Sequence, residues 1–264
     1  MNKDRILHIF AVAILACFAF GAAQARADVY MKQKVHTGAF QVMGQTQPEK
    51  DEIMIFWLGA NAARTDHENG TTMIFLGDKK VLYMIDNNKQ TYAEMPMDFD
   101  KMFEAAATEA GAGEDPEKAE AMKKMPGFMK NMMKGMMGNM SAKVTETGET
   151  KKIGSWDCRK YLVEMDMGMG TSSAETWATE DLRIDYSLAF TMANAMMAGQ
   201  PGFEKIVQEM KKIKGVVVLQ TATVKMMGSE VTTATELLEC VDKGAPAGNY
   251  DVPAGYKKVK GIKK

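Results

Sequence analysis

The amino-acid sequence predicts an α+β fold, built as one domain from residues 28–264. In the first third of the chain, short segments rich in β-branched and aromatic residues recur at intervals of about 8–12 residues, which is typical of an antiparallel meander. From Asp98 a helical periodicity replaces this pattern, and a second set of strands follows residue 140. The chain has 264 residues, 46% of them hydrophobic, which is enough for a sizeable core. Its net charge of −1 argues against nucleic acid as a partner.

Residues 1–27 have the pattern of a cleaved secretory signal peptide. Lys3 and Arg5 precede an apolar run from Ile6 to Ala23, and small residues at 25 and 27 suit a signal peptidase. We therefore expect export to the periplasm. Two alternatives stay open: a membrane anchor, because the run is close to the length that spans a bilayer, and lipoprotein processing at Cys17.

The predicted strands of the first set are separated by turn-forming residues. Asn69-Gly70, Gly77-Asp78 and Asp86-Asn87-Asn88 all tolerate the left-handed conformation that tight turns use. The predicted strands are Val29–Gln45, Glu52–Leu58, Ala62–His67, Thr72–Leu76, Val81–Ile85 and Thr91–Met95.

A methionine-rich helical insertion is predicted at about 98–140, where Asp98 caps a first helix and Pro116 opens a second. Beyond it we expect helices over 181–198 and 202–213. The strands expected in this half are Ala142–Glu149, Arg159–Met169, Ser173–Thr179, Val216–Lys225 and Glu230–Val241.

Eight methionines between 122 and 140 fall on one face of the second predicted helix, with lysines on the other face. Three interpretations remain open. The methionines could fill an ordinary core. They could face an apolar ligand or a membrane, because Met is over-used where a surface accepts varied apolar partners, and the lysine face would suit anionic headgroups. They could also capture a soft metal such as Cu(I).

Met165, Met167 and Met169 offer a second arrangement for Cu(I), because alternate residues of a strand project from one face. The simpler interpretation is an apolar strand face that lines the same cavity as the helix.

Two cysteines, Cys158 and Cys240, remain after residue 27. In an oxidising compartment two such cysteines usually pair, so we expect a structural disulfide, which would restrain the unfolded chain by roughly 4–5 kcal/mol.

The sequence contains no motif that predicts catalysis, and we expect neither an enzyme nor a cofactor. His36 and His67 are far apart in sequence, and His67 lies among turn residues, which is typical of a solvated loop histidine. The spacings G-x-S-x-G, H-E-x-x-H and the P-loop do not occur.

Several segments together resemble the exported bacterial family known as domain of unknown function 4412. They are the run from Arg64 to Pro96, Gly148–Tyr161, Glu175–Trp177, Lys214-Gly215 and Val252–Lys258. That family is similar to the lipoprotein-carrier fold of the periplasmic proteins LolA and LolB. The resemblance implies an antiparallel sheet curled into an unclosed half-barrel, with helices over its concave, apolar face.

These observations favour a non-catalytic periplasmic protein that binds an apolar molecule, such as an acyl chain or a lipid-modified partner, with peripheral membrane contact compatible with the lysine face. The predicted ligand-binding residues are Phe128, Met129, Met132, Met133, Met136 and Met140. A copper-handling protein and a ligand-free structural module of the envelope are the alternatives. The sequence carries no signal for the oligomeric state.

Overall fold

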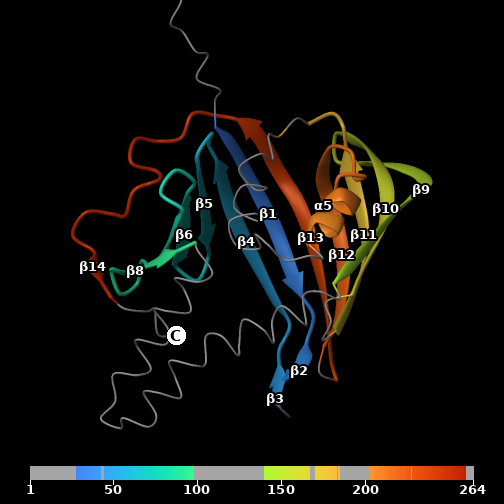
Figure 1. The fold of residues 1–264 in the computed structure, drawn as a ribbon, viewed down its shortest axis with the longest axis horizontal. Coiled ribbons are helices and arrows are strands. Elements are labelled where there is room, and N and C mark those ends of the chain that lie inside the picture. Colours follow the sequence, from blue (N-terminus) through green and yellow to red (C-terminus); the bar gives the residue numbers. More distant parts are fainter. Residues whose placement is uncertain are drawn as a thin grey trace, which may run out of the picture.

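A computed structural model of the chain describes residues 28–42, 45–97, 140–166, 170–182, 184, 203–226 and 228–259. Twelve strands form one open sheet in the order β14-β8-β7-β6-β5-β4-β1-β13-β12-β11-β10-β9. A separate two-stranded ribbon, β2 and β3, extends from one end (Figure 1). The strands are β1 Val29–Thr37, β2 Phe40–Val42, β3 Gln45–Gln47, β4 Lys50–Leu58, β5 Ala62–His67, β6 Thr71–Leu76, β7 Val81–Asp86, β8 Thr91–Pro96, β9 Ser141–Ile153, β10 Trp156–Asp166, β11 Gly170–Thr179, β12 Val216–Met226, β13 Ser229–Asp242 and β14 Lys257–Lys258.

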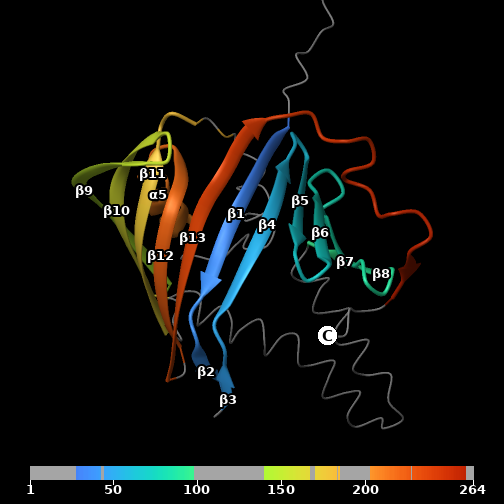
Figure 2. The same cartoon turned by 180° about the vertical axis from the view of Figure 1, so that it is seen from behind.

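Strand β1 joins the two halves of the sheet. It pairs antiparallel with β4 on one side and with β13 on the other, and Met31 faces Phe56 and Cys240. Outside this junction, strands that follow each other in sequence pair as an antiparallel meander, from β4 to β8 and from β9 to β13. The two-residue β14 adds in parallel to β8. Figure 2 shows β1, β4 and β13 side by side at the centre of the sheet.

Bulges accompany the curl of the sheet. The register shifts at Lys32/Gln33 between β1 and β13, at Trp177/Ala178 between β11 and β12, and at Arg159/Tyr161 between β9 and β10. An extra residue in one strand of a pair bends that strand and increases its twist. The two halves are accordingly angled toward each other, without closing (Figure 1).

One helix, α5 (Phe203–Met210), packs against the β9–β11 part of the sheet. Met210 and Ile213 lie on a buried cluster of β-strand residues. The Glu209 carboxylate accepts a hydrogen bond from the backbone N–H of Val144 at 2.9 Å. The cluster consists of Val144, Tyr161, Val163 and Ala178. We call the face of the sheet that carries α5 the inner face, and the opposite one the outer face.

The C-terminal segment, residues 243–258, holds the outer face of β5–β8. The Arg64 side chain donates to the backbone oxygen of Asn249 at 2.9 Å, and the Tyr256 hydroxyl donates to Asn87 Oδ1 at 3.2 Å. Arg64 also binds both carboxylate oxygens of Asp66. In Figure 1 this segment runs in red beyond β5 and β6 to β14.

The expected α+β class is wrong for the described part of the chain. The described residues are mostly strand, with α5 as their one helix, and they show no set of helices over a concave face. The α+β prediction depended on helices over 98–110, 116–140 and 181–198. Most of these segments lie outside the described residues, as does the signal peptide predicted at 1–27 with Cys17. The four of their residues that are described carry no helix; they are Met140, Asp181, Leu182 and Ile184.

Candidate functional site

The inner face can be followed from α5 across the whole sheet by strand register, because residues directly opposite each other project to the same side. Tyr161, which lies in the cluster beneath α5, is opposite Thr176, and Thr176 is opposite Gln220. Gln220 faces Thr235, which faces Val35, which in turn faces Glu52 of β4. Alternate residues of β4 from Glu52 to Leu58 therefore lie on the inner face.

The inner face of β1 and β4–β8 is mostly apolar and rich in methionine. One row across the strands runs from Met31 through Phe56 and Thr65 to Met73, Met84 and Ala93. The neighbouring row runs through Leu58, Ala63, Phe75, Leu82 and Met95. We define the methionine face as Met31, Met54, Met73, Met84 and Met95 with Phe56, Leu58, Phe75 and Leu82.

The two faces of β4–β8 contain different aliphatic residues. Every methionine of these strands projects to the inner face, and every isoleucine projects to the outer face. The isoleucines are Ile53, Ile55, Ile74 and Ile85. Isoleucine is β-branched and rotationally stiff, so it suits a fixed core. Methionine is unbranched and polarizable, so it adapts to irregular or changing neighbours.

Burial differs between the two sets in β6 and β7, whereas in β4 Ile53, Met54 and Ile55 are all half-buried. On the outer face Ile74 and Ile85 are 0% and 1% exposed. On the inner face Met54, Met73, Met84 and Met95 are half-buried. Phe75 packs with Met97, and both are buried, so the end of the methionine face near Met97 is firmly packed.

A polar group lies at the other end of the methionine face. His67 Nδ1 lies 3.0 Å from Glu52 Oε1, and Lys50 Nζ donates to Glu52 Oε2 at 2.8 Å. Hydrogen bonds from Lys50 and His67 lower the pKa of Glu52 despite its partial burial. His67 is thus the half-buried last residue of β5, and the expectation of a solvated loop histidine is wrong.

Most of the residues predicted to bind the ligand lie outside the described residues. These are Phe128, Met129, Met132, Met133 and Met136. Met140 is described: it is half-buried and directly precedes β9, at the sheet edge opposite β8 and β14.

Of the three methionines suggested for Cu(I), Met165 packs against the cluster beneath α5, and this contact accounts for it as a core residue. Met167 and Met169 lie outside the described residues.

Cys158 and Cys240 are free thiols in this structure, so the predicted disulfide is not formed here. Cys158 belongs to an apolar cluster on β1 and β10–β13, and Cys240 packs against this cluster; burial raises the pKa of each thiol. However, β11 and β12 lie between β10, which carries Cys158, and β13, which carries Cys240. Adjacent strands are about 4.8 Å apart, whereas a disulfide requires Cα atoms within about 7 Å. Pairing would therefore require a rearrangement of the sheet.

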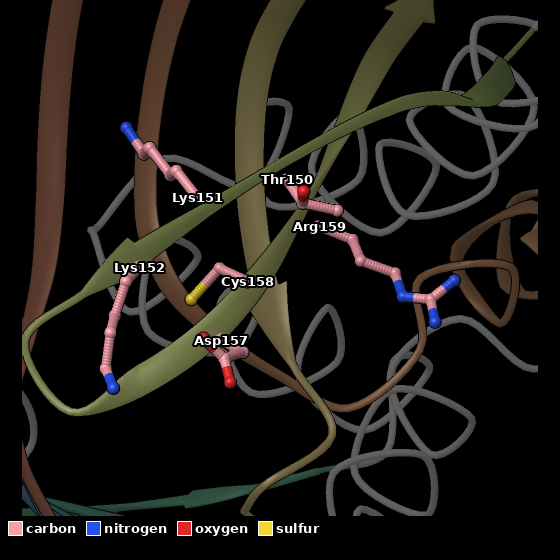
Figure 3. A pocket seen from close by; sticks show the side chains of 6 residues that line it. All are labelled: Thr150, Lys151, Lys152, Asp157, Cys158 and Arg159. Atoms are coloured by element: carbon pink, nitrogen blue, oxygen red, sulfur yellow. The ribbon is translucent and has the colours of Figure 1, made fainter.

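A pocket of about 390 Å³ lies at the β9–β10 hairpin. Its lining residues are Thr150, Lys151, Lys152, Asp157, Cys158 and Arg159. Figure 3 shows the side chains of Lys151, Lys152 and Arg159 pointing in different directions. The Lys151 ammonium lies 4.0 Å from the centre of the Trp177 ring. Since the cations do not converge on one point, the pocket is a poorer candidate than the methionine face.

Sequence reasoning missed the methionine face, although the signal was present. Met54, Phe56 and Leu58 alternate with Ile53, Ile55 and Trp57, so the period of two assigns the two sets to opposite faces. Both sets are apolar, and apolar residues on both faces indicate only a sheet that is covered on both sides. The side chain type, not its hydropathy, distinguishes the faces.

In the part of the chain that the structure describes, no helix is long and apolar enough to cross a membrane. Nor do the described His, Cys, Asp and Glu side chains form a group of three or more that could hold a metal ion. No known family model and no curated protein matches the chain. The resemblance to domain of unknown function 4412 stays a prediction.

Proposed function

We propose that this protein is an exported, periplasmic, non-catalytic protein that binds an apolar molecule, of the acyl-chain or lipid type, on the methionine face. The observation that carries the proposal is the separation of methionine and isoleucine between the two faces of β4–β8. The signal-peptide pattern of residues 1–27 supports export.

The residues of the outer and inner faces suit different kinds of packing partner. The outer face carries a fixed partner, the C-terminal segment, which forms hydrogen bonds with Arg64 and Asn87. Stiff isoleucines suit such a partner. The flexible thioethers on the other face suit apolar partners of variable shape. A long apolar chain, which has many conformations, is a ligand of this kind.

Burial energies favour such binding. Complete burial of a methionine side chain contributes roughly 1.5–3 kcal/mol. Since four of the five methionines are half-buried already, each could still gain roughly 1 kcal/mol from a ligand. Several such contacts could retain an acyl chain, and a charge placed among them would have to be desolvated.

The test is titration of the purified protein with a fluorescent fatty-acyl probe, alongside native mass spectrometry after gentle purification. We expect saturable binding by the wild type, and at least a tenfold loss of affinity in the double variant Met73→Asp/Met84→Asp. These two residues face each other across β6 and β7, so the double change places two charges at one point of the face.

Leu162→Asp is the matched control, because Leu162 is a 40% exposed apolar residue of β10 on the outer face, opposite Glu175. It should bind the probe like the wild type, and circular dichroism should show that all variants are folded. A wild type that is empty after purification and ignores the probe would overturn the proposal, as would equal loss of affinity in Leu162→Asp.

A further inference from the structure

We propose that His67 and Met54, at the polar end of the methionine face, form a binding site for a soft monovalent metal ion of the Cu(I) class. Met54 also belongs to the methionine face, but the metal site binds a ligand of different chemistry. The inference therefore does not depend on the proposed binding of an apolar molecule. It also differs from the two methionine groups that the sequence suggested.

The first element is a histidine held by a carboxylate. His67 Nδ1 lies 3.0 Å from Glu52 Oε1, and the two side chains are 19% and 17% exposed. Glu52 in turn accepts a hydrogen bond from Lys50 at 2.8 Å. The imidazole is therefore fixed in orientation without being closed off from solvent.

The partner fixes the tautomer. The Glu52 carboxylate accepts a hydrogen bond from the Lys50 ammonium at 2.8 Å, and a carboxylate paired with an ammonium group can only accept hydrogen bonds. Nδ1 must then carry the proton, and in the neutral ring the lone pair is on Nε2. Histidines that bind metals commonly donate their second ring N–H to a carboxylate in this way.

The second element is the thioether directly opposite. Met54 is the cross-strand partner of His67, so their Cβ atoms are about 4.5–5.5 Å apart and on the same face. A further thioether, Met73, is opposite Thr65, the next inward-facing residue of β5. Thioether ligands select Cu(I), and imidazole also binds copper. One imidazole with one or two thioethers suits this ion better than Zn²⁺, which takes four ligands.

The chain contains a natural comparison site. His36 Nδ1 lies 2.7 Å from Asp51 Oδ1, and the carboxylate again has a lysine partner, Lys34, at 3.1 Å. This pair lies on the outer face, where the described residues of β4–β8 include no methionine. Both histidines contact a carboxylate that is also paired with a lysine, but only His67 has a methionine directly opposite it.

The experiment is titration of the ¹⁵N-labelled full chain with Ag(I), a redox-stable ion of the same class, read from the ring ¹H–¹⁵N resonances of the two histidines. These resonances belong to the two histidine rings, so they report binding at each histidine even if silver also binds to cysteines or to other methionines. We expect Nε2 of His67 to shift and to saturate, with His36 unaffected over the same range.

Met54→Leu keeps the apolar volume and should weaken the silver response of His67 at least tenfold. His67→Gln should leave binding of the acyl probe unchanged, so failure of this site and failure of the apolar-ligand proposal are distinguishable. The proposal is overturned if the His67 ring does not respond, if both histidines respond together, or if Met54→Leu responds like the wild type.

Discussion

Gly215, at the entry to β12, provides a sharp test of the packing between β11 and β12. Its φ is +85°, in the left-handed region, and an added Cβ would lie 1.8 Å from the Thr179 carbonyl oxygen and 2.9 Å from the backbone nitrogen of Glu180. A left-handed conformation costs an L-residue about 1–2 kcal/mol. The obstacle is backbone, so relief requires the two strands to separate, and overpacking of this kind typically costs about 1–3 kcal/mol. Gly215→Ala should therefore lower the free energy of unfolding by roughly 2–5 kcal/mol.

Gly228→Ala separates the two contributions. Gly228 has a φ of +80°, and its added Cβ would meet nothing within 4 Å. This variant should lose only the conformational part, about 1–2 kcal/mol. Urea unfolding followed by tryptophan fluorescence measures both. Equal losses in the two variants would refute the close contact between Gly215 and the end of β11.

Two further outcomes concern ion pairs. Arg64→Met removes the guanidinium donors that bind the Asp66 carboxylate and the backbone oxygen of Asn249. We therefore expect the free energy of unfolding in urea to fall by about 1–3 kcal/mol. Arg159, whose side chain is 53% exposed, is the control, and an equal or larger loss in Arg159→Met would contradict this expectation. The pKa of Glu52 is lowered from 4.5 in the folded protein. The ionised Glu52 therefore stabilises the fold above pH 4.5, and this contribution is lost as the pH falls through the folded-state pKa. In Glu52→Gln the urea midpoint should depend less on pH in that acid range than it does in the wild type. The same pH dependence in both proteins would contradict the pairing of Glu52 with Lys50 and His67.

The local structure of the strands could be predicted well. The expected segment Ala62–His67 coincides with β5, and the predicted starts of β7, β8 and β12 are also those observed. The long segment Val29–Gln45 instead divides into β1, β2 and β3. The turns were partly right: Gly70 has a positive φ as expected, but the next two turns place Lys80 and Gln90 in that conformation.

The arrangement of the strands could not be predicted in the same way. Period-two alternation assigns residues to faces but does not say which strands are neighbours. The position of β1 between β4 and β13 depends on a partner about 200 residues away in sequence. The role of His67 was hidden for the same reason, because Glu52 is 15 residues away and reaches it only through the β4–β5 register.

The double pairing of β1 has a consequence for how the chain folds. Strands β4 to β8 can form their hairpins as soon as they have been synthesised, since each pairs with its neighbour in sequence. The second edge of β1 has no partner until β13, about 200 residues later in the sequence, has been synthesised. Until then a hydrogen-bonding edge is exposed, which invites association with other nascent chains. Assembly of the complete sheet is therefore a late event that depends on the last part of the chain.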